Sequence, residues 1–295
     1  MKKFLSFFVI CLFMVTGLTG CFWKKGDVTI GVSISTLNNP FFVELRDGIK
    51  EEAEEYGYDV TILDAQDDTA AQLDHIDDLI AKKVDIIIIN PVDSDAIATA
   101  VEAANDAGIP VITVDRSANG GEVVTHIASD NVAGGKMAGE YLLELVGENA
   151  KVVELQGIPG ASATIDRGKG FHSAVDGKLN VVSSVTANFN RSEGLSVMED
   201  LLEANPSLVG VFAHNDEMAL GAIQALKAAG RTNVVVIGFD ATDDAKNAVT
   251  EGTMAATVAQ QPKLMGTLSI EYAKKTLDDK EVDESIPVDL TLVKK

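Results

Sequence analysis

The chain has 295 residues, and its 45 Asp and Glu outnumber its 24 Lys and Arg, which gives a formal net charge of −21. A surface this acidic would be repelled by phosphate backbones, so the charge argues against nucleic-acid binding. The length is sufficient for two domains of ordinary size.

The first 20 residues predict an export signal that is not part of the fold. Lys2 and Lys3 form a basic start, and the apolar run from Phe4 to Val15 is too short to span a bilayer comfortably. The segment Leu18-Thr19-Gly20-Cys21 resembles the lipobox of bacterial lipoproteins, which implies cleavage before Cys21 and attachment of lipid to its sulfur. The alternative is an ordinary secretory signal with an incidental cysteine, and both interpretations predict an exported protein.

Loss of the signal would also change the cysteine content and the charge. Cys11 leaves with it, so the mature chain would keep one cysteine and could form no internal disulfide. The two signal lysines are lost as well, and the remaining 22 basic and 45 acidic residues give a net charge of −23. We interpret residues 21–26 as a lipidated tether, without which so acidic a chain would be held off an anionic membrane surface.

From residue 28 to about residue 278, short apolar runs alternate with longer amphipathic ones. We expect strands at Val28–Ser33, Asp59–Leu63, Val84–Ile89, Val111–Val114, Val123–Ala128, Ala150–Leu155, Val181–Thr186, Leu208–Ala213, Val234–Gly238 and Ala255–Ala259. A first helix is expected from the apolar spacing between Phe42 and Tyr56. Further helices are expected at Ala70–Ala81, Ala96–Ala107, Gly134–Leu145, Arg191–Ala204 and Ala219–Ala229.

Several of these strands, such as Val84–Ile89, are almost entirely apolar. Such runs are typical of parallel strands that helices cover on both faces. No linker rich in Pro or Ser interrupts the alternation. The pattern therefore predicts an α/β fold of two doubly wound parallel-sheet lobes, with a chain that crosses between them more than once.

The loop from Ser35 to Phe42 lies where the first strand should end and the first helix begin. Asn39 is a suitable N-cap and Pro40 a suitable first helical residue. Crevices outside the carboxyl ends of parallel strands are where open α/β sheets bind ligands. The adjacent rings of Phe41 and Phe42 either both pack between helix and sheet, or at least one faces the cleft as an apolar wall for a small polar ligand.

Most of the other predicted strands are also followed by a planar hydrogen-bonding side chain. These side chains include Asn90, Asp115, Arg116, Gln156, Arg167, Asn188, Asn215, Asp240 and Gln260, and two further rings, Phe189 and Phe239, lie at the same ends. Arg and carboxylate groups can bond two neighbouring hydroxyls, and aromatic faces cover the C–H faces of a sugar ring. A single carboxylate there is most often a helix cap, but the whole set predicts a pocket for a small polyhydroxylated molecule.

Signals for other chemistries are absent from the sequence. The four His are scattered without metal-ligand spacing, and no Walker, G-x-S-x-G or strand-following G-x-G-x-x-G motif occurs. The acidic segment Asp278 to Glu284 lacks the central Gly of a calcium loop and is interpreted as a solvated turn. We therefore expect no catalytic residues, no metal and no cofactor.

Eight segments closely resemble the periplasmic sugar-binding proteins of bacterial ABC importers, and among them the D-ribose-binding proteins. The segments are STLNNPFF (35–42), INPVDSDA (89–96), VDR (114–116), HIASDN (126–131), ELQGI (154–158), AHNDEMALGA (213–222), GFD (238–240) and PVDL (287–290). The similarity runs from about Val28 to the C-terminus. Two features depart from the family. His214 stands where the family often has Gln, and the lipobox implies a surface-tethered receptor instead of a soluble periplasmic one.

The resemblance implies a ligand site, a domain arrangement and partners. The implied ribose-contacting residues are Ser35, Asn39, Phe41, Phe42, Asn90, Asp115, Arg116, Arg167, Phe189, Asn215, Phe239, Asp240 and Gln260. Crossings near Asp130, Gln261 and Leu290 would divide the chain into lobe one (27–129 plus 261–289) and lobe two (130–260 plus 290–295). The implied partners are the sugar and the ABC permease subunits, with a chemoreceptor left open. We expect a monomer that is anchored at the cell membrane by lipid and closes on its ligand by hinge motion.

Three rival functions are compatible with parts of the sequence. A sugar-modifying enzyme could use Asp115 and Asp240 as a carboxylate pair, but neighbours such as Arg116 are expected to favour ionised carboxylates over a proton-donating acid. A sugar-responsive repressor would need a DNA-binding headpiece where the export signal stands. A receptor for another sugar, such as allose, galactose or a signalling furanose, stays open.

Overall fold

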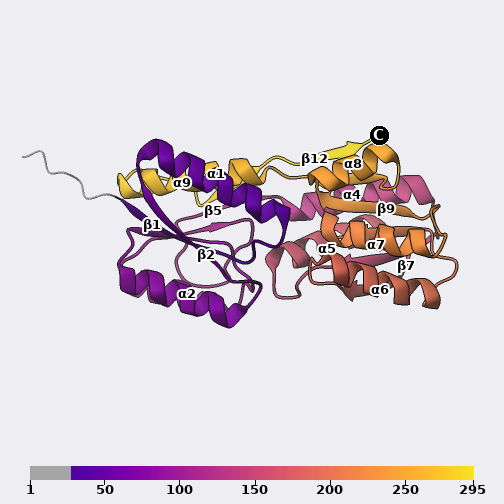
Figure 1. The fold of residues 1–295 in the computed structure, drawn as a ribbon, viewed down its shortest axis with the longest axis horizontal. Coiled ribbons are helices and arrows are strands. Elements are labelled where there is room, and N and C mark those ends of the chain that lie inside the picture. Colours follow the sequence, from indigo (N-terminus) through magenta and orange to yellow (C-terminus); the bar gives the residue numbers. More distant parts are fainter. Residues whose placement is uncertain (1–27) are drawn as a thin grey trace, which may run out of the picture.

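The computed structural model describes residues 28–295 and places them in two lobes that lie end to end along the long axis of the molecule (Figure 1). The sheet of lobe one has six strands in the order β11-β5-β4-β3-β1-β2, all paired in parallel. Its strands are β1 (Thr29–Ile34), β2 (Asp59–Asp64), β3 (Ile86–Ile89), β4 (Val111–Val114), β5 (Thr125–Ser129) and β11 (Ser285–Val288). Its helices are α1 (Pro40–Tyr56), α2 (Thr69–Lys82), α3 (Ala98–Asp106) and α9 (Pro262–Leu277).

The sheet of lobe two has the corresponding order, β12-β10-β9-β8-β6-β7. Its strands are β6 (Lys151–Gln156), β7 (Asn180–Thr186), β8 (Gly210–Ala213), β9 (Val235–Asp240), β10 (Ala256–Ala259) and β12 (Thr291–Lys294), of which β12 alone pairs antiparallel. Its helices are α4 (Asn131–Val146), α5 (Ser162–Val175), α6 (Arg191–Ala204), α7 (Asp216–Ala228) and α8 (Asp243–Glu251). The predicted fold class, two doubly wound parallel-sheet lobes, is therefore confirmed.

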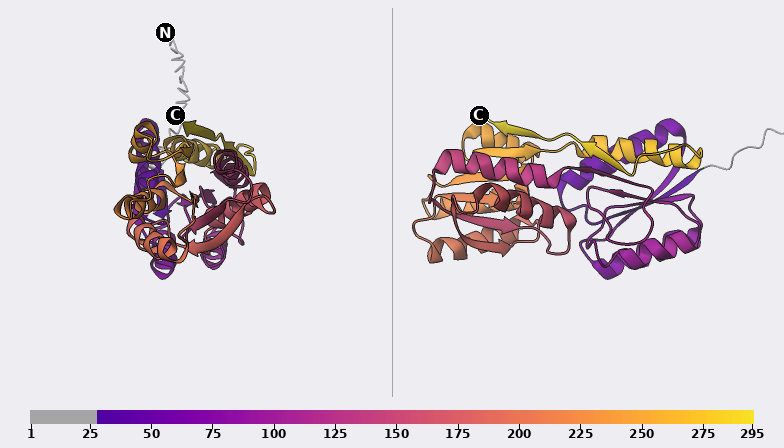
Figure 2. Two further views of the ribbon diagram at one scale, coloured as in Figure 1. Left: turned by 90° about the vertical axis from the view of Figure 1, so that its right-hand side faces the viewer. Right: turned by 180° about the vertical axis from the view of Figure 1, so that it is seen from behind.

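The chain passes between the two sheets after β5, after β10 and after β11. Figure 2, which shows the molecule from behind, lets the last passage be followed from α9 through β11 to β12. The last two strands of the chain, β11 and β12, thus each form an edge of one sheet. The three passages lie together on one side of the space between the lobes, as a hinge requires.

The start of α1 shows how local sequence positions the pocket side chains. The Asn39 side chain accepts a hydrogen bond from the Phe41 backbone N–H at 3.0 Å, and Pro40 occupies the first helical turn, as predicted. The helix ends at Gly57, whose φ of +67° is a left-handed conformation that Gly adopts without strain. Leu45 lies on the buried side of the helix with no exposed surface.

Some element boundaries and two strands differ from the sequence-based expectation. Strand β3 begins two residues later than predicted, because the Val84 N–H still bonds to the Leu79 carbonyl at the end of α2. Strands β11 and β12 were not predicted. Each has four residues at the edge of a sheet, which is too short to produce a hydrophobic pattern.

Each lobe buries its own apolar core. In lobe one, Ile30, Ile88 and Ile112 from neighbouring strands are fully buried beneath α1 and α9. In lobe two, Phe171 and Phe212 stack at 4.8 Å between α5 and the sheet. No helix within residues 28–295 has the length and apolar character needed to cross a membrane.

Candidate functional site

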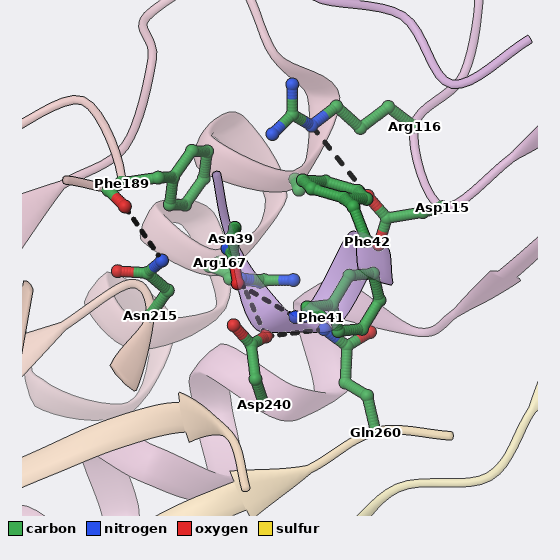
Figure 3. A pocket seen from close by; sticks show the side chains of 11 residues that line it. Asn39, Phe41, Phe42, Asp115, Arg116, Arg167, Phe189, Asn215, Asp240 and Gln260 are labelled. Atoms are coloured by element: carbon green, nitrogen blue, oxygen red, sulfur yellow. Dashed lines mark hydrogen bonds and ion pairs between the residues drawn. The ribbon is translucent and has the colours of Figure 1, made fainter. Parts of the chain in front are cut away.

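A small pocket lies between the lobes, at the carboxyl ends of their strands (Figure 3). It is lined by Asn39, Phe41, Phe42, Asp115, Arg116, Ala163, Arg167, Phe189, Asn215, Asp240 and Gln260. All of these except Ala163 were among the positions predicted from the sequence. Ala163, in the first turn of α5, was missed because a small apolar side chain carries no chemical signal.

Three predicted residues do not line the pocket but lie directly behind it. The Ser35 hydroxyl donates to Asn90 Oδ1 at 2.6 Å, and Asn90 Nδ2 lies 3.3 Å from Asp115 Oδ2, to which it donates. The Phe239 ring packs against the Arg167 guanidinium, 3.9 Å from the ring centre. These residues orient the lining side chains, and their direct contact with a ligand stays a prediction.

Lobe one supplies an aromatic wall. The rings of Phe41 and Phe42 meet edge to face at 5.1 Å, and each side chain is about 3% exposed. Both rings belong to the core of lobe one, yet both also line the pocket. The two alternatives left open by the sequence are therefore both realised, because the helix begins at the mouth of the cleft.

Lobe one also supplies a carboxylate and a guanidinium after β4. The backbone at Asp115 has a φ of +65°, an uncommon conformation that turns its side chain and that of Arg116 into the pocket. Arg116 Nη1 donates to the Pro91 carbonyl at 3.1 Å, and its guanidinium carbon lies about 5 Å from the ring centres of Phe42 and Phe189. The Arg116 guanidinium is thus held between the ring of Phe42 from lobe one and the ring of Phe189 from lobe two.

Lobe two places Arg167 opposite this pair. Its Nε donates to Asn131 Oδ1 at 2.8 Å and its Nη1 to the His214 carbonyl at 2.6 Å. Asp240 Oδ1 lies 3.7 Å from Nη1 and accepts a hydrogen bond from Gln260 Nε2 at 2.8 Å. Arg167 is therefore fixed on three sides while it lines the pocket.

Burial dominates the electrostatics of these groups. It raises the pKa of Asp115 and raises that of Asp240 well above its ordinary value, while the neighbouring guanidinium charges act in the opposite direction. Burial also lowers the pKa of Arg116 and Arg167, against the charges of the carboxylates. The charges of Arg116 and Arg167 favour ionised carboxylates, as expected, but burial acts against them and the net shift of both carboxyl pKa values is upward.

Several polar atoms in the pocket have no hydrogen-bond partner among the described residues. They include the acceptors Asp115 Oδ1 and Gln260 Oε1 and the donor Arg116 Nε. Buried polar groups are costly unless they are paired, and a hydroxyl group can both donate and accept. The pocket is therefore suited to a small molecule that carries several hydroxyls.

The four His lie away from the pocket lining. His214 Nε2 lies 2.9 Å from Glu154 Oε1, and His172 Nε2 lies 3.3 Å from the other oxygen of that carboxylate. His75 and His126 lie within hydrogen-bonding distance of hydroxyl groups of lobe one. Residues 28–295 contain no group of three or more His, Cys, Asp or Glu side chains that could hold a metal.

A second hollow adjoins the pocket on the side of α1 and α6. It shares Asn39, Phe42, Arg116 and Phe189 with the pocket. Its other lining residues are Thr36, Asn38, Asp67, Asn188, Asn190, Arg191, Ser192 and Glu217, from both lobes. The hollow therefore adjoins the pocket between the lobes and is lined mostly by polar side chains.

The lobes also touch beside the pocket through a serine clasp, which consists of Ser94, Gly160, Ser117 and Ser162. The Ser94 N–H donates to the Gly160 carbonyl at 2.9 Å, and the Ser162 N–H donates to Ser94 Oγ at 3.2 Å. The Ser117 N–H donates to Ser162 Oγ at 3.0 Å. These bonds join lobe one to lobe two, so the structure shows a closed cleft.

Comparison with known proteins places this architecture in a family. Residues 30–281 match the model of the periplasmic binding protein domain. The chain belongs to the periplasmic binding protein family. It is 53% identical over 268 residues to the ribose import binding protein of Escherichia coli (strain K12), a match that covers 90% of each chain. It is 52% identical over 269 residues to the ribose import binding protein of Bacillus subtilis (strain 168), covering 91% of this chain and 88% of the other.

A solved structure of similar fold comes from Actinobacillus succinogenes. This ABC transporter solute-binding protein with bound D-allose is 33% identical, with a TM-score of 0.85 over 91% of this chain and 98% of the other. The relatives are solute-binding proteins, which confirms the prediction that this periplasmic binding protein is not an enzyme. Membership of the family also implies a location outside the cytoplasm.

Proposed function

We propose that this protein captures D-ribose in the pocket between its lobes and delivers it to the membrane permease of an ABC importer. The pocket carries the proposal, because fork-shaped Arg and Asp side chains and Phe rings converge there from both lobes. Ribose is favoured over other sugars by the relatives whose names specify ribose import, which match along about nine-tenths of both chains.

In this proposal each lobe contributes one arginine and one carboxylate to the sugar hydroxyls. Asp115 and Arg116 act from lobe one, and Arg167 and Asp240 act from lobe two. The ring of Phe189, which lies beside both guanidiniums, covers the C–H face of the sugar. No covalent chemistry is involved.

The mechanism is hinge closure. We propose that residues 27–129 plus 261–289 and residues 130–260 plus 290–295 move as two bodies about Asp130, Gln261 and Leu290. Gln261 Nε2 donates to the Asp289 carbonyl at 3.1 Å, so two of the hinge segments are bonded to each other. A sugar held by both lobes stabilises the closed form, and the permease recognises that shape in a monomeric receptor.

We further propose that the mature chain is anchored by lipid on Cys21, which lies outside the described residues. The support is the sequence Leu18-Thr19-Gly20-Cys21. Cys21→Ala is expected to release the protein from membranes or to block its maturation, whereas Cys11→Ala in the signal should change neither. Unchanged membrane fractionation and unchanged mass of Cys21→Ala would reject lipidation.

A receptor for another monosaccharide is the second candidate. The observation that favours it is the likeness to solved relatives of other sugars, such as the protein with bound D-allose and a galactofuranose binding protein, 31% identical with a TM-score of 0.87. Identity to the ribose import proteins is higher, at 53% for the Escherichia coli protein.

Isothermal titration calorimetry distinguishes the two candidates. The soluble mature protein with Cys21→Ser is titrated with a panel of pentoses and hexoses, including allose and galactose, and the sugars are recovered and analysed afterwards. Ribose is expected to bind most tightly and to be recovered unchanged. If a hexose gives heat and a thermal shift while ribose gives neither, the ligand assignment is wrong, and any new product would reject the receptor function.

A further inference from the structure

Asp216 is a fully buried carboxylate that does not line the pocket. It is the first residue of α7 and lies behind the turn that follows β9. Its Oδ2 accepts hydrogen bonds from the Thr242 N–H at 2.8 Å and the Thr242 hydroxyl at 3.2 Å. Its Oδ1 accepts from the Thr257 hydroxyl at 2.7 Å. The carboxylate therefore ties the start of α7 to the turn after β9 and to β10.

This network reaches the turn that carries Asp240. The Ala241 N–H donates to Thr257 Oγ1 at 3.1 Å, so the same hydroxyl joins Asp216 to the backbone beside Asp240. Asp240 has a φ of +117° and Ala241 a φ of +56°, both unfavourable for residues with a side chain. Such a backbone persists only where its surroundings hold it, and the Asp216 network bonds the N–H groups of Ala241 and Thr242, which directly follow Asp240.

The neighbouring strand leaves room for this carboxylate. Gly238 lies on β9 two residues before Asp240, and a Cβ atom at Gly238 would collide with Asp216 Oδ1. A strand interior gains nothing from glycine itself, which loses more conformational freedom on folding than other residues. The glycine and the carboxylate therefore fit as a pair.

We infer that Asp216, together with Thr242 and Thr257, is a positioning residue that holds the Asp240 carboxylate in the geometry that receives the sugar hydroxyls. The inference rests on the proposed function, since it requires that Asp240 contacts the ligand. Asp216 itself lies outside the pocket lining and acts through Asp240.

The test uses Thr257, whose hydroxyl is the link between Asp216 and Ala241. Thr257→Val keeps the shape of the side chain and removes the hydroxyl, whereas Thr257→Ser keeps the hydroxyl. Sugar affinity is measured by calorimetry on the soluble mature protein. Thr257→Val is expected to bind about tenfold more weakly than the parent, the size of one displaced hydrogen bond to a charged group. Thr257→Ser is expected to bind like the parent.

Thr250→Val is the control, because Thr250 is exposed on α8 in the same lobe and its hydroxyl donates to the Lys246 carbonyl, away from the pocket. It is expected to leave affinity unchanged. Asp216→Asn probes the same link from its other end and is expected to weaken binding as Thr257→Val does. Both variants are checked for folding by thermal unfolding, and either one that folds is sufficient for the comparison.

A double-mutant cycle separates positioning from a general structural role. In an Asp240→Ala background, Thr257→Val is expected to cause no further loss of affinity, because the residue on which it acts is gone. The inference is overturned if Thr257→Val binds as tightly as the parent, or if it weakens binding by the same factor with and without Asp240. The ratios are taken with whichever sugar the parent binds, so a wrong assignment of ribose does not decide this test.

Discussion

Removal of Arg167 should reveal where the binding energy lies. Its Nε and Nη1 are bonded to Asn131 and to the His214 carbonyl, which leaves the N–H groups of Nη2 for the sugar. Hydrogen bonds to charged groups contribute ~1.5–3 kcal/mol each. At ~1.4 kcal/mol per decade, Arg167→Ala should weaken ribose binding by roughly tenfold to a hundredfold or more.

The same change should also lower stability, because Arg167 is 3% exposed and its removal leaves buried partners unpaired. We expect a loss of ~1–3 kcal/mol, which is small enough for a domain of ordinary stability to remain folded. Urea unfolding measures this loss, and calorimetric titration with ribose measures the affinity of the folded variant.

Arg231→Ala is the matched control for this experiment. Arg231 is a half-buried arginine of lobe two that donates to the Leu208 carbonyl at 2.7 Å, and it does not line the pocket. Its removal should lower the stability of the protein but leave its affinity for ribose unchanged. His75→Ala should likewise leave the affinity for ribose unchanged. The placement of the pocket is refuted if Arg167→Ala binds ribose as tightly as the parent, or if either control abolishes binding in a folded protein.

Three further predictions concern other parts of the molecule. Phe42→Ala should weaken ribose binding roughly two- to tenfold through lost ring contact, with little change in the ranking of ribose epimers in competition titrations; a reversed ranking would contradict this role. Ser94→Ala removes the Oγ that accepts from Ser162 in the serine clasp, so ribose should dissociate up to about tenfold faster in stopped-flow experiments, and an unchanged rate would show that the clasp does not hold the closed form. Although burial opposes it, bonding to His214 lowers the pKa of Glu154 from 4.5 to about 2. The stability this provides is present above pH 4.5 and lost as pH falls toward 2, by about 3 kcal/mol in the parent; urea unfolding of Glu154→Gln should lack this loss, and an equal loss in both proteins would contradict it.

Local sequence signals were sufficient to predict much of the fold and many of the residues that line the pocket. The cap at Asn39 with Pro40 fixed the start of α1, and nearly continuous apolar runs such as that ending at Ile89 fixed the buried parallel strands. Because parallel strands end at one edge of a sheet, the sequence alone places side chains such as Asp115 and Asp240 in one cleft.

The features that the sequence did not predict depend on how deeply a side chain lies behind the pocket surface and on the relative position of the lobes. Asn90 and Phe239 follow the same strand-end pattern as the lining residues, yet they lie one layer behind them, and no local signal distinguishes these two depths. The bond between Ser94 and Ser162 joins residues 68 positions apart and exists only when the lobes are closed. The balance between burial and the Arg charges at Asp240 likewise depends on how completely the closed cleft excludes solvent.

A crystal structure of the mature protein grown with D-ribose tests the central proposal most directly. We expect one ribose molecule between the lobes, with its hydroxyls bonded to Arg116 and Asp115 from one lobe and to Arg167 and Asp240 from the other, and with Phe189 against its ring. A ribose molecule that is bound elsewhere, or that contacts one lobe only while the cleft stays open, would contradict the proposal.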